Sequence, residues 1–232
     1  MRNLALVWVL AGCLLGCGGW KPSDTTFTDK RDGKVYKIVK IGSQTWFAEN
    51  LNYVAEGSKC YGEGGKVEVK VQNFVITKTL SNTEVQANCD KYGRLYNWKT
   101  ALTACPAGTH LPTAKEWATL VDYVGGGETA GTKLKSSTGW KSFNDVPAGT
   151  DEYGFSALPG GCGHSDGDFS ASDYGYWWSA TEDVADNYGD SWVGVNIRGM
   201  GYSHESVDGY LDEKTKLFSI RCVVDDRKET RK

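Results

Sequence analysis

One segment constrains the fold of this chain more than any other: Cys105 to Trp117, which reads Cys-Pro-Ala-Gly-Thr-His-Leu-Pro-Thr-Ala-Lys-Glu-Trp. Thr113 and Glu116 form a capping box, in which each side chain accepts a hydrogen bond from the other residue's backbone at a helix start. Apolar residues follow at helical spacing, and the glycines at 125–127 end the helix. A cysteine before this helix and another near the chain end, Cys222, indicate a disulfide that closes almost the whole second half of the domain.

The N-terminal residues predict export. Met1-Arg-Asn carries one positive charge, and the apolar run from Leu4 to Leu15 is shorter than the about 20 residues that span a bilayer. It is typical of a secretory signal. The run ends in two lipobox-like sequences, Leu10-Ala-Gly-Cys13 and Leu14-Leu-Gly-Cys17. We predict a lipoprotein signal peptide at 1–16 with lipidation of Cys17, which leaves the more realistic apolar region. Lipidation of Cys13 is the alternative, and a third interpretation is an ordinary signal with incidental cysteines.

The rest of the chain is typical of one exported globular domain. We predict a lipidated N-terminus and flexible tether at 17–31, a domain at 32–225 and a charged tail at 226–232. The formal net charge of -3 gives no electrostatic reason to expect nucleic-acid binding. Nine Trp and 12 Tyr beside 29 Gly indicate a loop-rich, aromatic-rich fold, and exported aromatic-rich modules often face sugars or partner proteins. We place the protein in the bacterial cell envelope, held by its lipid and most simply in the outer membrane.

Cysteine usage agrees with an oxidising compartment. We pair Cys105 with Cys222, and Cys60 with Cys89. In the chain-entropy model the first disulfide stabilises by roughly 4–5 kcal/mol. Cys162 is left over and is either free or paired with whichever leader cysteine survives. No two cysteines after the leader have the spacing of a zinc knuckle, so zinc is not expected.

Periodicity predicts strands at both ends of the domain and helices between them. Alternation at 34–41 and 44–47 predicts an opening hairpin. The Val-, Ile- and Thr-rich run at 66–80 predicts a projecting β-ribbon, inserted at about 61–88 and bridged at its base by a disulfide. The other predicted elements are helices at 94–104, at the capping box and around 132–136, a long loop region, and strands at 177–180, 192–197 and 218–224.

Six separate pieces of the sequence resemble one known family, the Fibrobacter succinogenes major paralogous domain. The resemblance runs from about Asp32 to Asp225 in the right order, and proteins of this family are typically exported and often lipidated. Their biochemical role is not established, so the resemblance implies no activity. The pieces are Gln44–Asn52, Lys91–Trp98, Cys105–Thr113 with Glu116-Trp117, Gly149–Gly161, Trp177–Glu182 and Ser219–Val223.

A more distant resemblance concerns the fold. A helix ending in Cys, then Leu-Pro-Thr and Glu-Trp on a second helix, a long loop region and a final Arg-Cys-Val strand are similar to the C-type lectin-like fold, which formylglycine-generating enzymes share. The resemblance implies an α+β fold in which two helices pack on short antiparallel sheets with a long loop region. It also implies paired terminal strands and the Cys105–Cys222 disulfide. A fold alone does not determine a function.

Binding residues are sought on the variable face of such a fold. Aromatic rings in the Gly- and Asp-rich second half could stack on sugars or anchor a partner protein. We therefore select Tyr174, Tyr176, Trp192, Tyr202 and Tyr210. The alternative is that these tyrosines only cover a small core.

One acidic loop is a candidate metal site. Asp166, Asp168 and Asp173 could supply some of the oxygen ligands that calcium requires, so calcium is the one cofactor considered. The alternative is a solvated acidic loop. The Glu-Pro-Asn, Gln-Pro-Asp and Trp-Asn-Asp motifs of calcium-dependent lectins are absent from the sequence.

The sequence favours a binding module over an enzyme. No pair of residues can be selected for catalysis, and the three histidines have no metal-ligand spacing. We expect a lipid-anchored surface module that binds polysaccharide or a surface partner protein. The alternatives are a lectin-fold oxidase related to formylglycine-generating enzymes, which a reactive Cys162 near a second thiol would favour, and a structural envelope lipoprotein.

Overall fold

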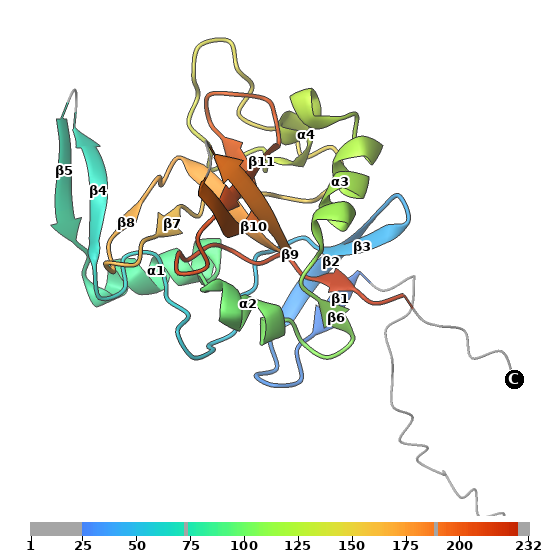
Figure 1. Cartoon of the computed structure of the whole chain (residues 1–232), viewed down its shortest axis with the longest axis horizontal. Helices are drawn as coiled ribbons and strands as arrows, with labels where there is room; N and C mark the ends of the chain where they lie inside the picture. Colours follow the sequence, from blue (N-terminus) through green and yellow to red (C-terminus); the bar gives the residue numbers. More distant parts are fainter. Residues whose placement is uncertain (1–24, 72–73, 188–189, 227–232) are drawn as a thin grey trace, which may run out of the picture.

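The computed structural model describes residues 25–71, 74–187 and 190–226 as an α+β domain, which confirms the predicted class (Figure 1). The predicted signal peptide, both lipidation candidates and most of the charged tail lie outside the described residues. Within the described part, no helix is long and apolar enough to cross a membrane. The helices are α1 (Asn82–Tyr92), α2 (Trp98–Ala104), α3 (Ala114–Tyr123) and α4 (Gly127–Leu134).

The first sheet joins the two ends of the domain. Its strand order is β1-β2-β3-β12-β6, and Val223 near the chain end pairs with Trp46 near its beginning. The predicted pairing of terminal strands is therefore confirmed. The strands are β1 (Thr26–Thr28), β2 (Val35–Ile41), β3 (Gln44–Phe47), β6 (Thr109–His110) and β12 (Val223–Val224).

The domain begins before residue 32, where the sequence analysis placed the end of the tether. β1 pairs antiparallel with β2, and Asp29 behind it is fully buried. Arg31 donates to the Asp29 carboxylate at 2.6 Å and to the Ala104 carbonyl at 2.7 Å. The tether prediction is corrected here, because polar residues can form an edge strand when an ion pair to a buried carboxylate fixes its end.

The second sheet contains a long hairpin that includes the predicted strands at 177–180 and 192–197 and extends beyond both of them. β9 (Tyr174–Asn187) pairs with β10 (Asp190–Gly201), and β11 (Asp208–Asp212) lies on the other side of β10. The register shifts between Val195 and Ile197, which marks a β-bulge. Glycine and aspartate obscure the alternation outside these two segments, so composition indicated loops there, where cross-strand pairing extends the sheet.

The third sheet carries the predicted ribbon, which projects from one end of the molecule (Figure 1). β4 (Lys66–Val71) pairs with β5 (Phe74–Thr79), and β4 also pairs with β8 (Phe169–Ser170), next to β7 (Cys162–Gly163). One face of the ribbon is apolar, because Val69 pairs with Ile76 and Val71 with Phe74. Its outer end is open to solvent, since the exposed fraction of Phe74 is 72%.

The structure has a helix that the sequence analysis missed. Helix α1 begins at a capping box of Ser81 and Glu84 and carries Cys89, its one buried residue. The other helices differ from prediction at their ends: α2 begins at Trp98 because Asn97 caps it, and α4 ends at Leu134. Helix α3 begins at the predicted capping box of Thr113.

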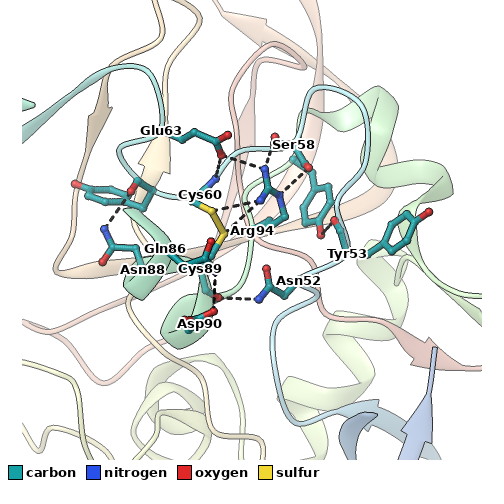
Figure 2. Close-up of a disulfide and its surroundings, with 12 residues drawn as sticks. Asn52, Tyr53, Ser58, Cys60, Glu63, Gln86, Asn88, Cys89, Asp90 and Arg94 are labelled. Carbon is teal, nitrogen blue, oxygen red and sulfur yellow. Dashed lines mark hydrogen bonds and ion pairs between the residues drawn. A yellow bond between two sulfur atoms is a disulfide. The ribbon is translucent and has the colours of Figure 1, made fainter. Parts of the chain in front are cut away.

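Both predicted disulfides are present. Cys60 is bonded to Cys89 and Cys105 to Cys222, while Cys162 is a buried free thiol. At the base of the ribbon, the Arg94 guanidinium lies beside the first disulfide, with Nη1 3.3 Å from Cys60 Sγ (Figure 2). Arg94 also donates to Ser58 and to Glu63, so one side chain fixes the loop before the ribbon to the segment after α1.

Candidate functional site

Three of the five selected aromatic residues form a continuous cluster. The rings of Tyr174 and Tyr176 on β9 are stacked, with centroids 6.1 Å apart and an interplanar angle of 12°. Tyr202, just after β10, meets Tyr174 edge-on at 5.7 Å. Phe143 from the long loop extends the cluster by packing edge-on against Tyr202 at 5.4 Å.

A fourth selected residue, Tyr210, joins this cluster through a glycine. A Cβ atom added to Gly199 on β10 would lie 2.7 Å from the Tyr210 ring and 3.3 Å from the Tyr176 ring. Both rings therefore pack over the bare backbone of β10, a contact that any larger residue at position 199 would prevent. Tyr174, Tyr176, Tyr202 and Tyr210 are called the tyrosine surface below.

Polar groups border the tyrosine surface. The hydroxyl group of Tyr210 donates to Asp208 Oδ2 at 2.8 Å, and burial together with this bond raises the pKa of Tyr210. Lys141 Nζ lies 6.0 Å from the centre of the Tyr202 ring and pairs with the Asp173 carboxylate at 2.6 Å. The surface thus combines flat apolar rings with hydrogen-bonding groups at its margin.

The fifth selected residue, Trp192, is separated from the tyrosine surface. Its ring packs over Gly194 on β10. A Cβ atom added to Gly194 would also lie 3.2 Å from the side chain of Leu211, so Trp192 and Leu211 share one face of the sheet. Tyr210 precedes Leu211 on β11, and successive side chains of a strand point to opposite faces of the sheet. Trp192 therefore belongs to the opposite face, and the structure does not place it with the four tyrosines.

The three aspartates considered for calcium do not form a ligand set. Asp166 accepts from the backbone of Asp168, Asp168 accepts from the Lys66 backbone, and Asp173 pairs with Lys141. Within the described residues, no group of three or more His, Cys, Asp or Glu side chains could hold a metal ion. The described geometry therefore gives the calcium hypothesis no support, because each carboxylate is engaged in a separate turn, strand or ion pair.

Cys162 has polar neighbours but lacks the features of a reactive thiol. Its Sγ atom lies 3.9 Å from His164 Nε2, and that nitrogen is 2.6 Å from the Ser170 hydroxyl group. Burial raises the pKa of the Cys162 thiol, which disfavours the reactive thiolate. The other cysteines of the described chain are in disulfides, so within it no second thiol faces Cys162.

A pocket of about 220 Å³ that the sequence analysis did not predict lies beside Arg221. Arg221 is 1% exposed, and its guanidinium donates to Asn50 and to three backbone carbonyl oxygens. Burial lowers the pKa of Arg221 to about 9, so the group remains charged at neutral pH. The walls combine the Glu49–Asn52 turn, the end of α1 and Ser156.

Asn50 links the parts of the chain that meet at this pocket. Its Oδ1 atom accepts from Arg221 Nε at 2.7 Å and from Trp177 Nε1 at 2.8 Å. Its Nδ2 group donates to the Tyr92 carbonyl and to the Ser219 hydroxyl group. These residues come from four of the motifs quoted above. The Asn-Leu-Asn and Ile-Arg-Cys segments of these motifs therefore meet at one point in space.

His110 links the last strand to the start of α3. Its Nε2 atom is 2.7 Å from Glu116, and its Nδ1 atom is 2.6 Å from Asp225. The Glu116 bond raises the pKa of His110, burial lowers it and the Asp225 bond raises it, with a result of about 9. Burial raises the pKa of Glu116, but the bonds from His110 and Thr113 outweigh burial and lower it to about 2.

These values predict a stability maximum at mildly acidic pH. The His110 contribution is complete below its unfolded pKa of 6.5 and is lost as the pH rises to about 9. The Glu116 contribution is complete above 4.5 and is lost as the pH falls to about 2. Between pH 6.5 and 9, the free energy of unfolding of the unmodified chain should fall by about 1 kcal/mol more than that of the His110→Gln variant. This value is reduced for solvent screening, because the site is partly exposed. Urea unfolding at several pH values measures this, and parallel curves would contradict it.

The geometry defines a disulfide-bonded α+β domain with an aromatic surface and a separate small pocket. A family model described as the Fibrobacter succinogenes major domain matches residues 39–224. The match covers most of the chain, so the chain belongs to this family, and the resemblance seen in the sequence is confirmed. No curated protein sequence and no solved structure matches the chain.

Proposed function

We propose that this protein is a surface binding module for polysaccharide and that it binds through the tyrosine surface. The observation that carries the proposal is the packing of the stacked Tyr174 and Tyr176 rings, with Tyr210, around Gly199. Aromatic rings held by a rigid sheet offer a large contact area at a low cost in side-chain entropy. No catalytic role is assigned to any residue.

A sugar ring would contact this surface in two ways. Its apolar C–H face would pack on the tyrosine rings, and its hydroxyl groups would exchange hydrogen bonds with groups at the margin. Asp208 and Asp173 supply acceptors there, and Lys141 supplies donors. The exposed fraction of Tyr210 is 45%, and Tyr174, Tyr176 and Tyr202 are half-buried, so each ring keeps part of its surface open to a ligand.

We propose that the fold is C-type lectin-like. Three features support this assignment: the helix cysteine Cys105 is bonded to Cys222 near the chain end, the terminal strands pair, and a long irregular segment lies between α4 and β9. In this arrangement the tyrosine surface lies on the sheet that follows the long segment.

We also propose that the protein is exported and held in the envelope by a lipid on Cys17, with Cys13 as the alternative. The leader sequence and the two disulfides support export, because disulfides persist in oxidising compartments. Mass spectrometry of the membrane fraction would identify the lipidated cysteine, and a Cys17→Ser chain that still carries lipid would favour Cys13.

A surface partner protein is the second candidate ligand. The observation in its favour is the projecting β4–β5 ribbon, whose apolar outer face is exposed at Val71 and Phe74. Exposed apolar patches of this kind mark sites of protein contact. The lectin-fold oxidase is disfavoured by the buried, high-pKa thiol of Cys162.

The experiment is a binding assay of the full chain, in mild detergent, against plant and bacterial polysaccharides. We expect saturable binding that weakens more than about tenfold in the Tyr174→Ala/Tyr176→Ala variant, since a central aromatic contact contributes about 1–2 kcal/mol. Tyr123→Ala is the matched control, because Tyr123 is 58% exposed on α3 and lies outside the cluster.

Two results of this assay would reject the polysaccharide proposal. The first is equal loss of affinity in the control and the double variant, because the binding would then not use the tyrosine surface. The second is no binding to any glycan by a folded chain, which would favour the partner protein and the ribbon.

A further inference from the structure

The pocket beside Arg221 has unused hydrogen-bond donors. A guanidinium group has five N–H donors, and four of those of Arg221 have acceptors. Within the described residues, the fifth has none. Tyr36 also lines the pocket, is fully buried, and accepts a hydrogen bond from the Asn52 backbone at 3.1 Å. Its own hydroxyl hydrogen has no acceptor in the described chain, and burial raises the pKa of Tyr36 to about 12, so that hydrogen is retained.

The charges around the pocket are also incompletely balanced. Two carboxylates line the pocket, those of Glu49 and Asp90. Four cations line it as well: Lys34, Lys37, Lys91 and Arg221. In the described part of the chain, no carboxylate lies within 4.0 Å of the charged nitrogen atoms of these four cations. A buried cation without a paired anion costs several kcal/mol, so an anion placed beside Arg221 would be favoured.

The pocket is suited to a small ligand with a single negative charge. Its volume of about 220 Å³ lies below the roughly 300–1,000 Å³ that drug-sized ligands occupy, so it fits one sugar ring or a smaller group. The four cations face three carboxylates, because Asp151 acts on Arg221 in addition to Glu49 and Asp90 on the walls. The single positive charge that remains favours a monoanion over a doubly charged phosphate.

We propose that this pocket binds the carboxylate group of a sugar acid, such as a glucuronate unit of an acidic polysaccharide. The carboxylate would accept a hydrogen bond from the unused donor of Arg221, and the three lysines would attract it to the pocket. The choice of a sugar as the ligand rests on the proposed polysaccharide function, whereas the selection of an anion rests on the pocket itself.

The test is calorimetric titration of the full chain in mild detergent with sodium glucuronate, glucose, acetate and inorganic phosphate. We expect saturable binding of glucuronate, weaker binding of acetate and phosphate, and none of glucose. In the Lys37→Met/Lys91→Met variant, glucuronate should bind at least about tenfold more weakly. Lys40→Met/Lys99→Met is the matched control, because it removes the same charge from exposed lysines that do not line the pocket.

The proposal would be overturned by no binding of glucuronate to the folded chain, or by an equal loss of affinity in the control variant. Equal binding of phosphate and glucuronate would also overturn it, since the pocket would then recognise charge alone. The tyrosine variants separate this test from the proposed function. Glucuronate binding should be unchanged in Tyr174→Ala/Tyr176→Ala, and neutral glycan binding unchanged in Lys37→Met/Lys91→Met.

Discussion

Replacement of Cys105 and Cys222 together by alanine is expected to lower the free energy of unfolding by about 5 kcal/mol. The disulfide joins residues 117 positions apart, and the cost of closing so long a loop in the unfolded chain grows with its length. Domains of this kind are stable by about 5–15 kcal/mol in total, so the loss removes a third or more of the stability. Urea unfolding followed by tryptophan fluorescence measures the change.

The second disulfide provides the matched control. Cys60 and Cys89 are 29 positions apart, so the same model gives about 3.6 kcal/mol for the Cys60→Ala/Cys89→Ala variant. Removal of the first disulfide should therefore be the more harmful by about 1 kcal/mol, and its variant should unfold at a lower urea concentration. The reverse order would contradict the loop-closure explanation. In that case the Cys60–Cys89 disulfide, with the Arg94 contacts beside it, would stabilise the base of the ribbon by more than loop closure predicts.

Local signals in the sequence predicted the elements whose structure is determined locally. The capping box of Thr113 and Glu116 begins a helix with a clear apolar face, and α3 forms there. The same kind of box at Ser81 and Glu84 begins α1, which the sequence analysis missed. The difference is physical: α1 buries only Cys89, so it lacks the apolar periodicity that distinguishes a helix from a polar loop.

Long-range pairing accounts for most of what the sequence did not predict. The β9–β10 hairpin is rich in glycine and polar residues, and its stability comes from cross-strand contacts and from packing under the tyrosine surface. Prediction of the binding residues was limited in the same way. Composition selected four tyrosines that lie together in the structure, but whether Trp192 joins them depends on strand register. The Arg221 pocket depends on contacts between residues up to 174 positions apart.

The contacts of Asn50 lead to the second large prediction: Asn50→Leu should lower the free energy of unfolding by about 3–5 kcal/mol. Leucine has a similar size, so the loss would come from hydrogen bonding rather than from a cavity. The Arg221 and Trp177 N–H groups would remain buried without their acceptor. A buried donor without a partner costs about 1–3 kcal/mol, and a charged donor costs more. Thermal and urea unfolding of the purified variant measure the effect.

A second substitution at the same position tests the electrostatic part of this explanation. Asn50→Asp retains both acceptor contacts and places a carboxylate 2.7 Å from the Arg221 Nε atom, while it loses the two bonds that Nδ2 donates. Because it pairs a buried cation, Asp should be less harmful than Leu by at least about 1 kcal/mol. Asn52→Leu is the control, since Asn52 donates one side-chain bond, to the Cys89 carbonyl, and should cost about 1 kcal/mol (Figure 2). If Asp and Leu at position 50 are equally harmful, the donated bonds to Tyr92 and Ser219 dominate, and the unbalanced charge of Arg221 contributes little to the energetics of the pocket.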